Sequence, residues 1–105
     1  MAEVSSIGGR GPDQLYRVYK GLDPFPVSSS NVESLAWDQS QGLLFIRYKN
    51  GGRLYCYDVP ATVFTGLATA ASKGKYVYDK IRGADGVRPA RLLDLDHRFP
   101  YLRVE

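Results

Sequence analysis

The sequence contains one cysteine, one histidine and no long apolar run, and each scarcity argues against a class of protein. With Cys56 alone, no intramolecular disulfide can form, and small secreted domains commonly depend on such bonds. No segment approaches the ~20 consecutive apolar residues that cross a bilayer, and no basic stretch followed by an apolar one opens the chain. These absences favour a cytoplasmic protein and disfavour secretion and membrane contact.

Strong charge of one sign is also missing. Against 14 Lys and Arg stand 11 Asp and Glu, which leaves a formal net charge of +3 and a pI near 9.1. This positive charge favours anionic partners, but it is smaller than the charge of a dedicated nucleic-acid binder, which carries a basic stripe. A length of 105 residues with 44% hydrophobic residues is typical of one folded domain with a single core.

No catalytic or metal-binding arrangement is evident. In a strand, Asp94 and Asp96 share one face while His97 points away, which is poor geometry for a metal ion. Cys56 lies within an apolar and aromatic stretch typical of a strand interior, and nothing identifies a third group to complete a Cys56–His97 pair. The sequence therefore predicts a protein that is not an enzyme and has neither metal nor cofactor.

The first 27 residues read as an N-terminal arm. Leu15 to Lys20 is an aromatic and basic stretch that suggests an edge strand, with alternate side chains on its two faces. Pro24 and Pro26 follow closely and argue against a helix there. We therefore expect an extended arm that enters the domain.

Period-two alternation begins at Val32 and predicts three strands. The first ends near Trp37, the second covers Leu43 to Tyr48, and the third covers Arg53 to Val59. Asn50-Gly51 between the last two is a strong hairpin signal, because both residues tolerate a positive φ, and the extra Gly52 leaves room for a bulge. These strands form an antiparallel meander whose apolar face requires cover.

Two helices are predicted to supply that cover. The first starts at Pro60, and its apolar stripe consists of Val63, Phe64, Leu67, Ala68 and Ala71. Ser72 then caps a second helix over Lys75 to Ile81, which Gly83 ends. The predicted fold is α+β: a three- or four-stranded antiparallel meander packed on one face by two helices. Extensions cover residues 1–27 and 84–105, and the domain covers residues 28–83.

An ordered set of residues within this central segment resembles the KTSC domain family. The matching residues are Ser29-Ser30-Asn31-Val32, Tyr48-Lys49-Asn50-Gly51, Tyr55, Tyr57, Val59-Pro60, Leu67, Ala71-Ser72-Lys73-Gly74-Lys75-Tyr76 and Ile81-Arg82. Trp37 stands where many relatives have a tyrosine. The family occurs at the C-terminus of some lysyl-tRNA synthetases and as stand-alone bacterial and phage proteins. The family has no established activity that the resemblance could imply. Its occurrence in tRNA synthetases suggests RNA binding, and its occurrence in phages suggests a role in the phage or virion.

Two polar regions are candidates for nucleic-acid or anion binding. In the first, a glycine turn and alternating cations and aromatics offer phosphate contacts and base stacking. Its residues are Ser72, Lys73, Gly74, Lys75, Tyr76, Tyr78, Lys80 and Arg82. The second, Ser29 to Asn31, offers hydroxyl and amide groups, with Asn31 the candidate contact. The structural alternative is that Gly74 only makes a turn, Tyr76 packs under the sheet, and Ser29 to Asn31 bond their own backbone.

The two extensions carry residues of the kind that anchor protein interfaces. These are Tyr16, Arg17, Tyr19, Phe25, Arg98, Phe99, Tyr101 and Arg103. The alternative is that the extensions fold back onto the domain. The leading functional hypothesis is a non-enzymatic protein-interaction or assembly module, a phage-type accessory or virion structural protein with a protein partner or virion subunits. The alternative hypothesis is a module that binds RNA or single-stranded DNA through residues 72–82.

Overall fold

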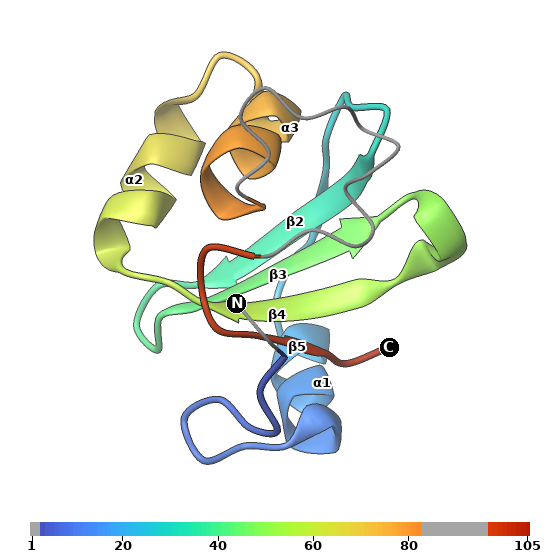
Figure 1. Ribbon diagram of the computed structural model, residues 1–105, viewed down its shortest axis with the longest axis vertical. Helices are drawn as coiled ribbons and strands as arrows, with labels where there is room; N and C mark the ends of the chain where they lie inside the picture. The colour runs from blue at the N-terminus through green and yellow to red at the C-terminus, as the bar shows by residue number, and fades with distance from the viewer. Residues whose placement is uncertain (1–2, 83–96) are drawn as a thin grey trace.

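The computed structural model describes residues 3–82 and 97–105, which fold around a five-stranded antiparallel sheet of order β1-β2-β3-β4-β5 (Figure 1). The strands are β1 (Phe25–Pro26), β2 (Val32–Asp38), β3 (Leu43–Tyr48), β4 (Leu54–Asp58) and β5 (Tyr101–Arg103). The helices are α1 (Pro12–Lys20), α2 (Ala61–Thr69) and α3 (Lys73–Tyr76), with a 3-10 turn, η1 (Asn50–Gly52), and a π turn, η2 (Val77–Ile81). The α+β class is confirmed, with one more strand than expected.

Strand β3 explains why the sheet is covered on both faces. Its residues alternate as predicted, so that Leu44 and Ile46 point to one side and Leu43 and Phe45 to the other, and all four are buried. We call the side that α2, α3 and η2 cover the first core, and the side that α1 covers the second core (Figure 1). The two expected helices thus cover one face as predicted, and a third helix that was not expected, α1, covers the other.

The predicted hairpin and the two later helices lie close to their expected places. Gly51 and Gly52 have φ angles of 72° and 65°, which is the conformation that favours glycine in this turn. Pro60 is the N-cap of α2, and Val63, Phe64 and Leu67 are buried beneath it. Ala68 and Ala71 are exposed and do not belong to the stripe. Gly83 lies outside the described residues.

The prediction of a strand over Leu15 to Lys20 is wrong, because these residues belong to helix α1. Pro12 occupies the first helical turn, and the backbone N–H of Gly11 donates to Oε1 of Gln14 at 3.1 Å. Leu15 is completely buried in the second core. The helix ends at Lys20, before the prolines that argued against it, and the edge strand of this region is β1.

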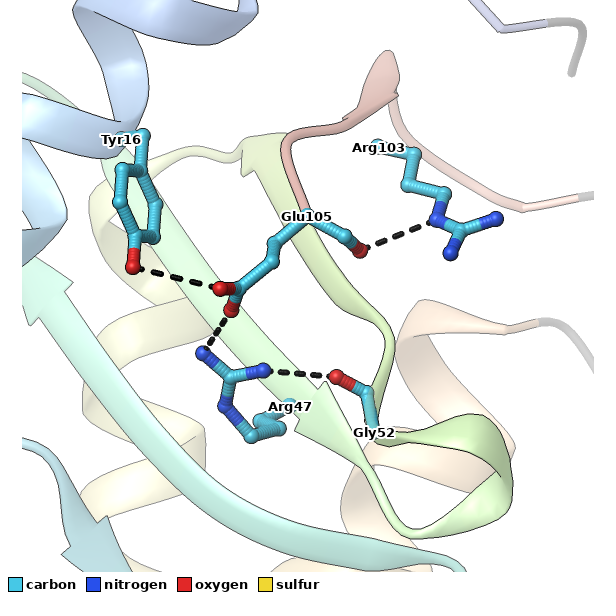
Figure 2. A network of polar contacts seen from close by, with 5 residues as sticks. All are labelled: Tyr16, Arg47, Gly52, Arg103 and Glu105. Atoms are coloured by element: carbon cyan, nitrogen blue, oxygen red, sulfur yellow. Dashed lines mark hydrogen bonds and ion pairs between the residues drawn. The ribbon is translucent and has the colours of Figure 1, made fainter.

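The C-terminal residues fold back onto the domain as β5, which pairs with β4. The outer edge of β5 is also occupied, since the Val4 N–H donates to the Tyr101 carbonyl at 2.9 Å. Figure 2 shows how Glu105 then joins α1 to the sheet: its carboxylate accepts from the Tyr16 hydroxyl at 3.2 Å and pairs with Arg47. These contacts hold α1 over the second core.

No helix in the part of the chain that the structure describes is both long and apolar enough to cross a membrane. Within residues 3–82 and 97–105, no cluster of three His, Cys, Asp or Glu side chains has the arrangement of a metal site. Asp94 and Asp96, which were considered as ligands, lie outside the described residues.

Candidate functional site

An open polar hollow of about 290 Å³ lies where the segment before β2 meets the start of α3. Its lining combines both polar regions of the sequence, although they lie far apart along the chain. The lining residues are Ser28, Ser29, Ser30, Asn31, Ser72, Gly74, Lys75 and Tyr78. The structure thus brings five predicted ligand contacts together: Asn31, Ser72, Gly74, Lys75 and Tyr78.

A close contact between Ser29 and Gly74 holds the two walls of the hollow together. A methyl group added at Gly74 would lie 2.5 Å from Oγ and 2.6 Å from Cβ of Ser29. The Ser29 hydroxyl oxygen in turn accepts from the N–H groups of Asn31 and Val32, at 3.1 and 3.2 Å. Ser29 therefore has a structural role in leading the chain into β2, and Gly74 is needed because no side chain fits there.

We expect Gly74→Ala to destabilise the protein by about 1–2 kcal/mol, because overpacking outweighs the gain in helix propensity. The measurement is urea unfolding followed by circular dichroism. Gly21→Ala is the matched control, since a methyl group there meets only ordinary contact at 3.5 Å from the Val18 carbonyl. Equal stabilities for the two variants would show that the Ser29–Gly74 contact is not tight.

The other wall of the hollow is set by the start of α3. The Ser72 hydroxyl accepts from the Lys75 N–H at 3.3 Å, which confirms its predicted capping role at a helix that begins two residues earlier than expected. Lys75 is exposed at the hollow, whereas the Lys73 ammonium donates to the Ala68 carbonyl at 3.4 Å and leans toward the end of α2. Lys75 is the cation that lines the hollow.

Three other residues of the predicted basic and aromatic patch lie elsewhere. The ring of Tyr76 packs against Gly66 of α2, where an added methyl group would lie 2.3 Å from the tyrosine oxygen. Arg82 is only 7% exposed, and its guanidinium carbon lies 5.0 Å from the ring centre of Tyr48. Lys80 is exposed but does not line the hollow. Tyr76 and Arg82 therefore do not line the hollow, and their contact with a ligand stays a prediction.

A buried chain of hydrogen bonds, which was not anticipated, lies in the first core. The hydroxyl oxygens of Tyr48 and Tyr57 are 2.7 Å apart, and Tyr57 lies 2.8 Å from Nδ1 of His97. The ring of His97 stacks on Tyr101 with centres 3.7 Å apart. Both tyrosines point to the first core, as their places in adjacent alternating strands imply.

Burial dominates the ionisation of these groups. It lowers the pKa of His97 to about 3, and the positive charge of Arg82 acts in the same direction. Burial likewise raises the pKa of Tyr57 well above its usual value. Both hydrogen-bonded groups are therefore neutral at pH 7, with His97 bonded as an uncharged imidazole.

Cys56 and His97 do not form a pair. Cys56 points into the second core, whereas His97 bonds Tyr57 on the opposite face of the sheet. Burial, with the nearby Asp58 charge, raises the pKa of the thiol to about 12, so it stays protonated at pH 7. The predicted absence of enzyme activity stays a prediction.

Five aromatic residues suggested as interface anchors pack within the protein itself. Tyr16 and Tyr19 border the second core, while Phe25, Phe99 and Tyr101 border the first. Tyr19 lies 5.4 Å from the ring of Phe45, and Phe25 meets Trp37 edge to face at 5.0 Å. The arginines of the set are exposed: Arg17, Arg98 and Arg103. The aromatic part of the extensions thus belongs to the fold.

These features define a class of protein: a small α+β domain with an antiparallel sheet and a polar hollow beside its helices. A model of the KTSC domain family matches residues 28–84, and the chain belongs to this family. A curated protein of Tsukamurella paurometabola is 36% identical over 52 residues, which are 50% of this chain and 78% of that protein. The crystal structure of a KTSC domain protein from Yersinia pestis is similar with a TM-score of 0.55 at 26% identity. The similarity covers 80% of this chain and 99% of that one.

Proposed function

We propose that this protein is a non-enzymatic binding module whose polar hollow holds a phosphate group of a nucleic-acid strand. The observation that supports this proposal is the meeting of two separate polar regions, with Lys75 at one wall and Asn31 at the other. Hydroxyl, amide and ammonium groups are the side-chain donors with which proteins contact nucleic-acid phosphates.

A second cation lies beside the hollow and strengthens the proposal. The backbone N–H of Lys49 donates to the carbonyl of Asn31 at 2.9 Å, so the end of β3 adjoins the lining. The Lys49 side chain is exposed. The backbone of Lys49 therefore adjoins one wall of the hollow, and Lys75 lines the other wall. A phosphate chain is an anion suited to a surface with these two lysines.

The assembly hypothesis receives less support than nucleic-acid binding, because the aromatic anchors on which it relied contact the protein's own cores. The polar edges of the sheet are also poorly suited to strand addition, since β1 is two residues long and ends at Pro26, and Val4 covers β5. A role in a phage particle or in the host cytoplasm stays a prediction. The remaining basis for it is the exposed arginines of the extensions.

We expect Lys75→Glu to weaken the binding of a labelled oligonucleotide and to flatten the dependence of its affinity on salt concentration. Each lost phosphate contact reduces the slope of log affinity against log salt by about 1. Fluorescence anisotropy between about 0.05 and 0.2 M salt measures both quantities. The double variant Lys73→Glu, Lys75→Glu tests whether Lys73, which leans toward α2, adds long-range attraction for the oligonucleotide.

Lys20→Glu is the matched control, because it changes the net charge equally from α1, on the second-core side of the sheet. Its salt dependence should stay close to that of the unaltered protein. An equal loss in both variants would mean that only net charge matters. Binding that neither change affects would reject the hollow as the site.

A further inference from the structure

We infer that the hollow receives one unpaired nucleotide, with its base against Tyr78, and that the protein therefore prefers single strands to duplexes. This inference deepens the proposed function and depends on it. Phosphate contacts alone do not distinguish single strands from duplexes, since both carry the same groups. The shape of the hollow and the aromatic side chain in its wall supply the distinction.

The size of the hollow favours a single small unit. At about 290 Å³ it is at the lower end of the volumes typical of small-ligand sites, and it is broadly open to solvent. A base within a duplex has both faces stacked and shows only its edges in the grooves. An unpaired base can instead leave the strand and enter a concave site with one face free.

Tyr78 is placed to meet that face. It lines the hollow from η2, and the backbone on its C-terminal side is fixed by two hydrogen bonds of 2.9 Å: Arg82 N–H to the Val77 carbonyl, and Arg98 N–H to the Ile81 carbonyl. π turns are rare and frequently occur at functional sites. Stacking of a base on a tyrosine tolerates any sequence, because every base has a π face.

The remaining lining groups fit the same ligand. Ser28 and Ser30 are exposed, and Asn31 is half-buried. Hydroxyl and amide groups both donate and accept hydrogen bonds, so they can satisfy the edge of any of the bases. Lys75 in the lining supplies a cation for a phosphate next to the seated nucleotide. We therefore expect weak sequence preference and strong preference for single strands.

The test compares a labelled single strand with a blunt duplex of the same sequence at ~0.1 M salt, using the unaltered protein, Tyr78→Leu and Tyr78→Phe. We expect the unaltered protein to bind the single strand on the order of ten-fold more tightly than the duplex. Tyr78→Leu should lose this preference, so that the ratio of its single-strand affinity to its duplex affinity falls toward one. Tyr78→Phe, which keeps the ring, should retain most of it.

A second variant keeps the test decisive if Tyr78→Leu is poorly folded. In Tyr78→Trp, the added indole should be quenched by the single strand and not by the duplex, relative to the background from Trp37. If Tyr78→Leu is folded and binds the single strand as well as before, or the fluorescence of the added indole does not respond, the inference is overturned. The proposed function still stands in that case if Lys75→Glu weakens binding. If the unaltered protein binds neither nucleic acid at about 0.05 M salt, both are rejected.

Discussion

Lowering the pH from 7 to 4.5 should reduce the free energy of unfolding by about 2–3 kcal/mol through His97 alone. The pKa of His97 is about 3 in the folded protein, because the ring is only 5% exposed and lies near Arg82. It returns to about 6.5 in the unfolded chain. The stabilisation by neutral His97 is thus fully present above pH 6.5 and is lost progressively as the pH falls toward 3.

The pH range separates His97 from the carboxylates. Glu105 and Asp38 also have lowered pKa values, through hydrogen bonds from Arg47 and from Ser40 respectively, and both start from ordinary values of 4.5 or below. Loss of stability that begins between about pH 6.5 and 5 is therefore due to the histidine. Urea unfolding at several pH values, followed by circular dichroism, measures it.

His97→Gln is the suitable comparison, because glutamine can still hydrogen-bond the Tyr57 hydroxyl but does not titrate. We expect this variant to be less stable than the unaltered protein at pH 7 and to have a flat pH dependence above about pH 5. Parallel curves for the two proteins over this range would show that His97 is not held neutral by the fold.

The second large effect is expected at Leu15, where substitution by alanine should cost about 2–5 kcal/mol. The side chain is completely buried between α1 and the second core, so its removal leaves a cavity beside Phe45 and Leu43. Since a domain of this size has only about 5–15 kcal/mol of stability, this loss is a large share. Urea unfolding monitored by circular dichroism gives the free energy and the m-value together.

Arg17→Ala on the same helix is the control, since Arg17 is exposed and alanine favours a helix; its effect should stay within about 0.5 kcal/mol. Deletion of residues 1–20 should be still more damaging than Leu15→Ala, because it uncovers the whole second core. A truncated protein with unchanged stability would mean that α1 is an independent arm, as the sequence alone suggested.

The error over α1 has a physical reason. Leu15 to Lys20 is short and alternates well enough to suit a strand, and two prolines follow it. The helical signals were also present: Pro12 in a first turn, and apolar residues at Leu15, Val18, Tyr19 and Leu22, which border one core. A short segment of this kind is decided by the surface that it covers, which here is the second face of the sheet.

That second face was itself indicated by the sequence. Leu43 to Ile46 is a continuous apolar run, and such runs are typical of strands buried on both sides. The requirement for cover on both faces could thus have been predicted from β3. Which segment supplies the cover could not, because α1 and β3 are far apart in the chain.

The hollow shows the same division. The tendency of Ser29 to bond nearby backbone and the capping role of Ser72 depend on residues within three positions, and both are as expected. The burial of Arg82 beside Tyr48 and the packing of Tyr76 against Gly66 depend on contacts that no local pattern reveals.

The sequence by itself determined the central hairpin, the strand alternation, the two later helices and the family, because each rests on residue preferences over short spans. Only the tertiary structure decided the side of the sheet that α1 covers, the joining of Asn31 to Lys75 in one hollow, and the bond between Tyr57 and His97. These features depend on contacts between residues that are distant in the chain, and such contacts are selected by the packing of the complete fold.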